Sequence, residues 1–301
     1  MSLIHPQLTA FAAVLDEGSF ERAAQRMSLT PSAVSQRIKA LEDRLGQVLV
    51  LRQSPCRATD AGKQLLRSLQ QMRLLESETL GSFGLRQHEA PKTTVAIAVN
   101  ADSLATWFLD ALAHLHEQHG LLFDVHVEDQ DHSTNLLREG SVLGAVTADA
   151  HPVQGCKVEP LGIMRYLPVA SPQFVERYIG KKLDAATLNA APMLVFNRKD
   201  QLQSRFIRSI TRARVTPPVH YLPSSTAFVD AAAMGLGWAM APEAMARERL
   251  ESGALRVLGA RRWLDVPLYW QHWSIRAETL GWITEALRRA SVNALRKPNM
   301  R

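Results

Sequence analysis

The sequence of 301 residues predicts an α/β protein in which two Rossmann-like lobes are preceded by an all-α head with a winged helix-turn-helix. Three observations favour this fold class. Two short helical patterns meet at a tight turn before residue 46, an apolar helical pattern with few helix breakers covers residues 61–82, and strand-like runs alternate with helical runs from residue 94 onward. We therefore expect a small head, one long connecting helix and two α/β lobes.

The helix-turn-helix pattern occupies residues 19–45. Ser19 is expected to cap the first helix and Thr30 the second, which starts at Pro31 because the first turn of a helix has no use for that amide hydrogen. Apolar residues at helical spacing predict the buried side of the second helix, and they are Ala33, Val34, Ile38, Leu41 and Leu45. The side chains left on the outer side are of the types that contact bases and phosphates, and they are Ser32, Ser35, Gln36, Arg37 and Lys39.

A short hairpin is predicted directly after this helix. Gly46 ends the helix, residues 47–52 have the pattern of a strand, and the returning strand begins at residue 57. Such a wing places Arg52, Arg57 and Thr59 beside the DNA backbone. A polar helix face alone is more often simply solvated, so the wing is the feature that favours DNA binding.

The alternating region predicts an open α/β sheet in two units. Strand candidates of the first unit lie at residues 95–99, 123–127 and 142–146, with helices at 104–118 and 134–139. Strand candidates of the second unit lie at 166–170, 193–196 and 237–240, and the chain returns to the first through 268–270 and a helix near 278–290. Because ligands of such sheets bind beyond the carboxyl ends of the strands, we expect a cleft lined by the loops there.

Composition and motifs indicate which other classes of protein the sequence does not fit. The formal net charge of +6 suits a polyanionic partner, although residues 29–57 carry only five basic against two acidic side chains. The ten histidines show no metal-ligand spacing, and no phosphate loop or nucleophile elbow appears, so we expect neither an enzyme nor a cofactor. Cys56 and Cys156 are expected to be reduced thiols. Without a signal segment or a long apolar run, a cytoplasmic location with no membrane contact is expected.

Residues 8–62 resemble the winged helix-turn-helix of the LysR-type transcriptional regulators. The matching runs include residues 23–24, 32–35 and 59–62, whereas Val50 stands where a Phe is usual and Pro31 replaces a common Gln. The resemblance implies a periplasmic-binding-protein-like effector domain, double-stranded DNA and RNA polymerase as partners, and a homodimer that assembles into a dimer of dimers. It also implies that helix 61–82 pairs with its twin; a helix packed on its own domain is the alternative.

The expected domain boundaries follow from the same resemblance and from the hinge signals Gly81, Gly84 and Pro91. The DNA-binding domain is expected at residues 1–60 and the linker helix with its hinge at 61–90. One effector lobe is expected at 91–163 together with 268–301, and the other at 164–267.

Within this family the chain is similar to the ArgP/LysG subgroup, whose members regulate the export of basic amino acids. The shared runs lie at residues 20–24, 32–39, 97–107, 127–129 and 144–147. The resemblance implies a regulator that senses L-lysine or L-arginine as its small-molecule effector and controls an exporter gene. A LysR-type regulator of a different metabolite and a solute-binding protein without DNA function are the alternatives.

A free basic amino acid carries one carboxylate and two cationic groups, so its site needs amide or hydroxyl donors together with carboxylates. Serines at helix starts can take the carboxylate, Asp102 and Asp129 are favoured for the amino groups, and aromatic rings can cover the aliphatic stem. The candidate effector-binding residues are Asn100, Asp102, Ser103, Glu128, Asp129, Thr147, Phe196, Ser224, Ser225 and Trp270.

Overall fold

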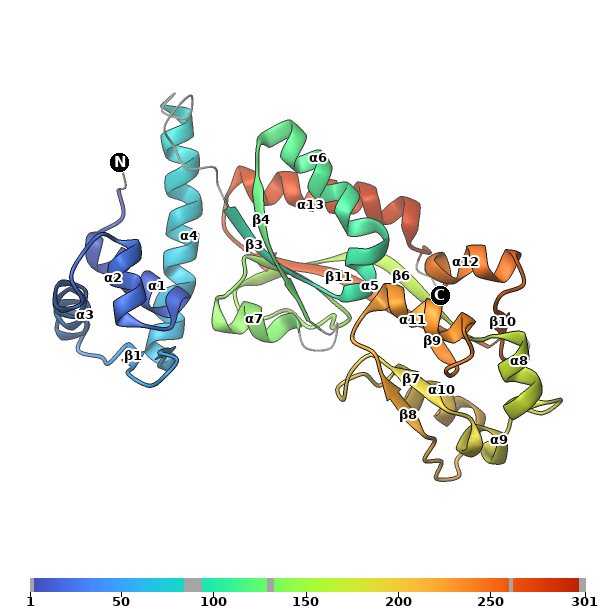
Figure 1. Ribbon diagram of the computed structural model, residues 1–301. Helices are drawn as coiled ribbons and strands as arrows, with labels where there is room; N and C mark the ends of the chain where they lie inside the picture. The colour runs from blue at the N-terminus through green and yellow to red at the C-terminus, as the bar shows by residue number, and fades with distance from the viewer. Residues whose placement is uncertain (1–2, 84–93, 129–132, 260–261, 298–301) are drawn as a thin grey trace.

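The computed structural model describes residues 3–83, 94–128, 133–259 and 262–297 (Figure 1). A helical head is followed by one long helix and by a larger α/β part with two lobes. The head consists of three helices and a hairpin, and their bounds are α1 (Pro6–Glu17), α2 (Phe20–Arg26), α3 (Pro31–Leu45), β1 (Val50–Leu51) and β2 (Arg57–Ala58).

Both predicted helix caps of the head are confirmed. Ser19 Oγ accepts hydrogen bonds from the first-turn amides of α2, and Thr30 Oγ1 accepts one from the amide of Ala33 in α3. Between the two helices Ser28 adopts a φ of 54°, the left-handed conformation that lets the chain reverse within a few residues. Thr30 therefore fixes the end of the turn where α3 begins, whereas Ser19 fixes the far end of α2.

The buried side of α3 agrees with the predicted stripe at its centre, where the buried residues are Val34, Ile38 and Leu41. The two ends of the stripe were predicted wrongly. Ala33 is only half-buried, and Leu45 exposes 47% of its surface. Leu45 is the last residue before Gly46, whose φ of 65° turns the chain out of the helix, and Leu49 beyond that turn is buried in the head core instead.

Helix α4 (Asp60–Ser82) joins the head to the α/β part and lies between them in Figure 1. Leu69 is buried in the core of the head, whereas Leu74 is buried in the core of the α/β part. Glu78 accepts a hydrogen bond of 2.8 Å from the amide of Thr279. The helix is therefore packed against both of its neighbours in the same chain.

The α/β part is built on one seven-stranded sheet with the order β10-β6-β11-β5-β3-β4 and with β9 beside β6. Strand β3 pairs in parallel with β4 and β5, and β11 is antiparallel to β5 and β6. The strand bounds are β3 (Thr94–Val99), β4 (Leu122–Val127), β5 (Gly144–Thr147), β6 (Cys156–Ala170), β9 (Ala239–Pro242), β10 (Arg256–Val257) and β11 (Leu264–Trp273).

Two groups of elements form the lobes. Lobe 1 contains β3 to β5 and the helical segments α5 (Ala101–Ser103), η1 (Leu104–Phe108, a π-helical turn), α6 (Leu109–His119), α7 (Ser133–Glu139) and α13 (Glu278–Ala294). Lobe 2 contains β9, the parallel pair β7 (Met193–Val195) and β8 (Val219–Tyr221), and the helical segments α8 (Pro172–Phe174), η2 (Val175–Ile179), α9 (Ala185–Ala190), α10 (Leu202–Ile210), α11 (Ser225–Ala233) and α12 (Glu243–Glu251). Among the described residues no helix is both long and apolar enough to cross a membrane.

Strands β6 and β11 run through both lobes and are longer than the sequence predicted. β6 has 15 residues and β11 has ten, where strands were predicted only at 166–170 and 268–270. Pro160 and Gly162 lie within β6, and because both residue types usually indicate a break in a strand, they hide its first half from a pattern search. The lobes consequently share one sheet, and the expected boundaries at 163/164 and 267/268 fall inside these strands.

Both cysteines are free and half-buried in the structure. Burial raises the pKa of the Cys156 thiol to about 11, an effect that the charge of Arg67 partly opposes. The nucleophilic thiolate form of Cys156 is therefore scarce at neutral pH.

Gly144 tests the packing of the shared sheet. A Cβ atom on Gly144 would lie 2.0 Å from the ring of Trp270, which is completely buried. We expect Gly144→Ala to lower the free energy of unfolding by about 1–3 kcal/mol, as overpacking does. The matched control is Gly281→Ala in α13 of the same lobe, where an added Cβ meets nothing within 4 Å and should gain about 1 kcal/mol of helix propensity. Calorimetric unfolding of the full chain measures both, and equal shifts would contradict the packing argument.

Candidate DNA-reading surface and effector site

The outer side of α3 presents the predicted DNA-reading residues to solvent. Ser32, Gln36 and Lys39 are exposed, and Ser35 and Arg37 are half-buried. Since the opposite side of the helix is fixed in the head core, these side chains form the accessible face of a short helix of the size that enters a major groove.

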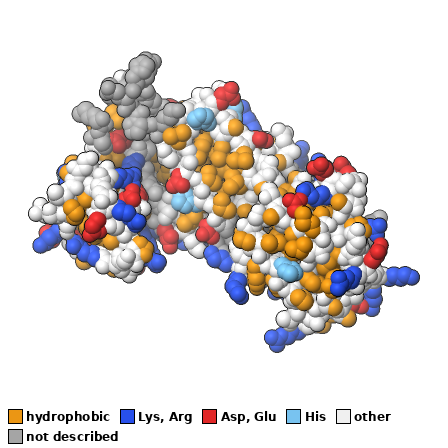
Figure 2. Space-filling view, viewed as in Figure 1, with side chains coloured by type: hydrophobic (Ala, Val, Ile, Leu, Met, Phe, Trp, Pro, Cys, Tyr) orange, Lys and Arg blue, Asp and Glu red, His pale blue; other side chains and the backbone are white. Residues whose placement is uncertain are grey.

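The wing lies directly beside this face. The Arg52 guanidinium is 4.9 Å from the centroid of the Phe20 ring, and its Nη1 donates to Ser35 Oγ at 3.4 Å. Arg57 is exposed on β2. Figure 2 shows Lys and Arg side chains on the surface of the head. The wing arginines are thus next to the outer side of α3, where phosphates of a bound duplex would pass.

Thr59 was predicted to contact DNA, and the structure gives its hydroxyl a different role. Thr59 Oγ1 donates to the carbonyl of Val48 at 2.7 Å and accepts from the amide of Gly62 at 3.0 Å, which makes it the cap of α4. A hydroxyl has a single proton, and here that proton is already donated. The side chain of Thr59 therefore cannot donate to a phosphate while it caps the helix.

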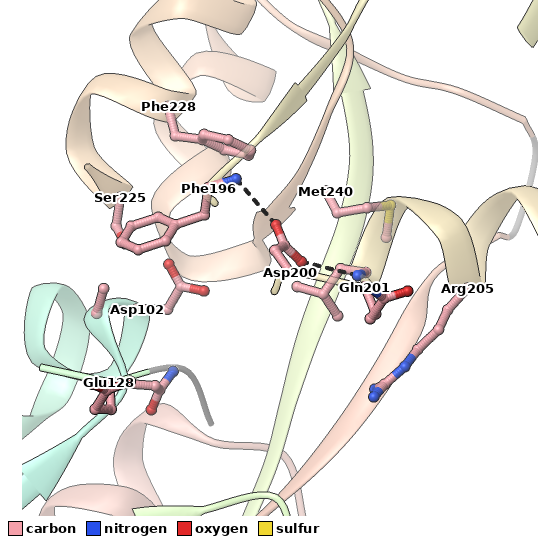
Figure 3. Close-up of a pocket in the computed structure, with 12 residues that line it drawn as sticks. Asp102, Glu128, Phe196, Asp200, Gln201, Arg205, Ser225, Phe228 and Met240 are labelled. Carbon is pink, nitrogen blue, oxygen red and sulfur yellow. Dashed lines mark hydrogen bonds between the residues drawn. The ribbon is translucent and has the colours of Figure 1, made fainter. Parts of the chain in front are cut away.

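A cavity of about 580 Å³, including its open mouth, lies between the two lobes (Figure 3). Lobe 1 lines it with Asn100, Ala101, Asp102 and Glu128, and lobe 2 lines it with Phe196, Asp200, Gln201, Leu202, Arg205, Ser225, Phe228 and Met240.

The lobe 1 wall comes from the carboxyl ends of two parallel strands, as the topology predicts. Asn100 follows β3 and Glu128 follows β4. Asn100 is only 4% exposed, and its Oδ1 has no hydrogen-bond partner among the described residues. Tyr166, on the shared strand β6, donates from its hydroxyl to Asp102 Oδ2 at 2.7 Å. A buried acceptor and an oriented carboxylate therefore stand side by side.

The lobe 2 wall has an acidic loop and the start of a helix. Asp200 accepts hydrogen bonds from the amides of Phe196 at 3.2 Å and Leu202 at 2.9 Å, which holds the loop before α10. Ser225 is the first residue of α11; it is 8% exposed, and its Oγ lacks a partner in the described structure. In Figure 3 Phe196 and Ser225 lie across the cavity from Asp102.

The charges of the lining favour a cation. Three carboxylates, those of Asp102, Glu128 and Asp200, stand against the single guanidinium of Arg205 among the described lining residues. A buried amide oxygen, Asn100 Oδ1, and a buried hydroxyl, Ser225 Oγ, have no hydrogen-bond partner within the described residues and belong to opposite lobes. Both groups are therefore available to a polar ligand in the cavity.

Five of the predicted effector residues line this cavity, namely Asn100, Asp102, Glu128, Phe196 and Ser225. Asp129 lies outside the described residues. Ser103 and Thr147 are fully buried and are not among the lining residues, and Ser224 instead caps α11 by accepting from the amide of Ala227.

Trp270 was predicted wrongly as a cover for the ligand. It is completely buried in the core, where its indole Nε1 donates to Thr284 Oγ1 at 3.0 Å, and it packs over Gly144. An aromatic residue on a strand suits a core as well as a binding site, and here β11 directs it into the core between the sheet and α13.

Sequence reasoning missed several lining residues of lobe 2, which are Asp200, Gln201, Leu202, Arg205, Phe228 and Met240. A signal for the first of them was present. The loop that begins at Asn197 follows the predicted strand 193–196, so the strand-end rule applied to lobe 1 would also have pointed to this loop. Phe228 and Met240 carry no such signal, because they are ordinary apolar positions of a helix and a strand.

Comparison with known proteins agrees with both parts of the structure. Residues 5–63 match the model of the bacterial regulatory helix-turn-helix protein, lysR family, and residues 88–291 match the LysR substrate binding domain. The HTH-type transcriptional regulator LysG of Mycobacterium tuberculosis is 50% identical over 287 residues, which cover 95% of this chain and 93% of that protein. The lysine export transcriptional regulatory protein LysG of Corynebacterium glutamicum is 41% identical over 96% of this chain and 98% of its own.

Solved structures of similar proteins have the same architecture over almost the whole chain. The crystal structure of ArgP from Mycobacterium tuberculosis matches with a TM-score of 0.86 at 48% identity and covers 98% of this chain and 99% of its own. Full-length LysG from Corynebacterium glutamicum with bound effector Arg matches with a TM-score of 0.77 at 38% identity, covering 97% and 100%. With a DNA-binding helix-turn-helix and a substrate binding domain in one polypeptide, the chain belongs to the LysR family of bacterial transcriptional regulators.

Proposed function

We propose that this protein is a cytoplasmic transcriptional regulator that binds L-arginine or L-lysine between its lobes and controls a gene for amino-acid export. The observation that carries the proposal is the cavity, which combines an excess of carboxylates with a buried amide oxygen and a buried hydroxyl that lack partners among the described residues. A basic amino acid supplies cations for the carboxylates, a donor for the amide oxygen and an acceptor for the hydroxyl. The bound arginine of the related LysG structure and the lysine-export names of relatives support the same ligand class.

The lining suggests how the ligand would lie. The α-carboxylate would accept from Ser225 Oγ and from the first-turn amides of α11, where the helix dipole favours an anion. The α-ammonium would donate to Asn100 Oδ1, and the side-chain cation would pair with Asp102 or Glu128. Apolar side chains are left for the aliphatic stem, and they are Phe196, Phe228 and Met240.

A ligand in this position contacts both lobes and would favour the arrangement in which both walls reach it. Regulation requires different ligand affinities in two arrangements, and a ligand held by two walls fulfils this requirement. Lobe 1 is attached to α4 by the hydrogen bond between Glu78 and Thr279, so a change of lobe angle can be passed to the DNA-reading head.

The DNA-bound form would be a homodimer that inserts two α3 helices into half-sites about 34 Å apart or a multiple of that distance. Its contact would be formed by the side of α4 where apolar residues remain exposed, namely Met72, Leu75 and Phe83. The same proposal includes assembly into a dimer of dimers, contact with RNA polymerase and the domain boundaries expected from the sequence. It also includes the side chains that would contact DNA, which are Ser32, Ser35, Gln36, Arg37, Lys39, Arg52 and Arg57.

Asp102→Asn tests the effector site. The amide oxygen can still accept from the hydroxyl of Tyr166, so the change removes the charge and little of the local geometry. We expect arginine affinity to fall about ten- to hundred-fold, because a hydrogen bond to a charged group contributes about 1.5–3 kcal/mol. Asp110→Asn, an equal charge change at an exposed position of α6, is the control and should bind as wild type. Titration calorimetry measures the arginine affinity of both variants. Wild-type protein that binds neither arginine nor lysine would refute the proposed function.

Gln36→Ala and Arg52→Ala separate the two modes of DNA contact. Loss of Gln36 should reduce discrimination between operator and scrambled DNA by about 1–3 kcal/mol, because a base contact is removed. Loss of Arg52 should weaken binding to all sequences and reduce the salt slope by about one. Fluorescence anisotropy over a salt series measures both effects, and indistinguishable profiles of the two variants would speak against this assignment.

Leu75→Glu tests the dimer contact. Leu75 is 40% exposed on α4, so a carboxylate there should not disturb the folded chain but would be buried in a dimer without a partner. We expect the variant to sediment as a monomer in analytical ultracentrifugation, whereas Leu75→Met should keep the wild-type mass. An unchanged mass of the Glu variant would exclude this side of α4 from the interface.

A further inference from the structure

An ion pair joins the two lobes at one residue of the cavity lining. Lys199 Nζ, from the loop that follows β7 in lobe 2, lies 3.5 Å from Glu128 Oε2, which follows β4 in lobe 1. The Glu128 side chain is 37% exposed and belongs to the cavity lining, and the Lys199 side chain is 55% exposed. An ammonium group of the protein itself therefore lies against one of the carboxylates of the cavity.

We infer that Lys199 is an internal competitor for the cationic end of the effector and thereby sets how strongly the site selects a second positive charge. This inference rests on the proposed function. Lys199 presents an ammonium on a four-carbon stem, the same group that a lysine effector carries. A ligand cation that reaches Glu128 must displace Lys199, whereas a neutral amino acid leaves the pair between the lobes intact.

The backbone of the loop is anchored while the end of the side chain is not. Asn197 Oδ1 accepts from the amides of Lys199 at 2.7 Å and Asp200 at 3.1 Å, and Asp200 in turn accepts from the amide of Leu202, the first residue of α10. The Cα atom of Lys199 thus keeps its place beside the cavity. Its long stem is half-exposed, so the ammonium can turn into solvent when Glu128 is taken by another cation.

The strength of the pair suits a competitor that can be displaced. Ion pairs with this degree of exposure contribute at most about 1 kcal/mol, which corresponds to about five-fold in affinity. A ligand that is also held by Asn100 and Ser225 exceeds this contribution easily. Salt weakens exposed pairs, so the competition should fade as ionic strength rises.

The test is calorimetric titration of full-length Lys199→Met, which keeps the length of the stem and removes the charge. We expect arginine and lysine to bind about two- to five-fold more tightly than to wild type at low salt, with the gain lost near molar salt and absent for a neutral amino acid. The matched control is Arg198→Met, since the Arg198 guanidinium lies 5.1 Å from the centroid of the Tyr221 ring and forms no ion pair with Glu128 in the described part of the chain.

A second comparison isolates the pair itself. In a Glu128→Gln background, Lys199→Met should bring no gain, because the carboxylate for which the two cations compete is gone. Equal or weaker arginine binding by Lys199→Met, or a gain that persists in the Glu128→Gln background, would overturn the inference while the proposed function stands. Wild-type protein that binds neither arginine nor lysine would overturn both.

Discussion

The geometry of the effector cavity depends on the antiparallel pairing of β6 with β11. These strands pair from Cys156 with Trp273 to Tyr166 with Leu264, and they carry the sheet from lobe 1 into lobe 2. The pairing is reinforced at its lobe 2 end by two hydrogen bonds of 2.7 and 2.8 Å between Arg165 and Asp265. Tyr166 on β6 also donates a hydrogen bond to Asp102 at the cavity. A change of angle between the lobes would therefore move a carboxylate of the site. The strands that connect the lobes are therefore directly linked to a group that would bind the effector.

The end of the chain also connects the two lobes. After α13 of lobe 1, Arg296 exchanges backbone hydrogen bonds with Ile163 of β6, and its guanidinium pairs with Glu243 at the start of α12 in lobe 2. In Figure 1 the end of α13 accordingly lies beside α12. Glu78 of α4 accepts a hydrogen bond from the first turn of α13. Helix α13 therefore contacts the linker helix at its start and is followed at its end by Arg296, which connects the lobes. This arrangement offers a continuous path from the cavity to the head, with α13 as its rigid element.

Local chemistry explains which features could be predicted from the sequence. The head was predictable because caps and a helix-starting proline act within a few residues, as Ser19, Thr30 and Pro31 do. The lobe 1 wall was predictable because parallel strands deliver their following loops to one edge of the sheet. The opposite wall depends on how lobe 2 meets lobe 1, and no local pattern marks Phe228 or Met240 for that contact. The first half of β6 and the burial of Trp270 were missed for the same reason, since tertiary packing decides both.

The carboxylates of the cavity already have partners within the protein, and this determines where a ligand can gain free energy. Asp102 receives the hydroxyl of Tyr166, Asp200 receives two backbone amides, and Glu128 faces Lys199. Among the described residues that line the cavity, Asn100 Oδ1 and Ser225 Oγ are the buried side-chain atoms without a partner, and they belong to different lobes. A ligand that satisfies both gains most where the two walls stand at the right separation, and such a difference in affinity between open and closed arrangements is what a regulator needs.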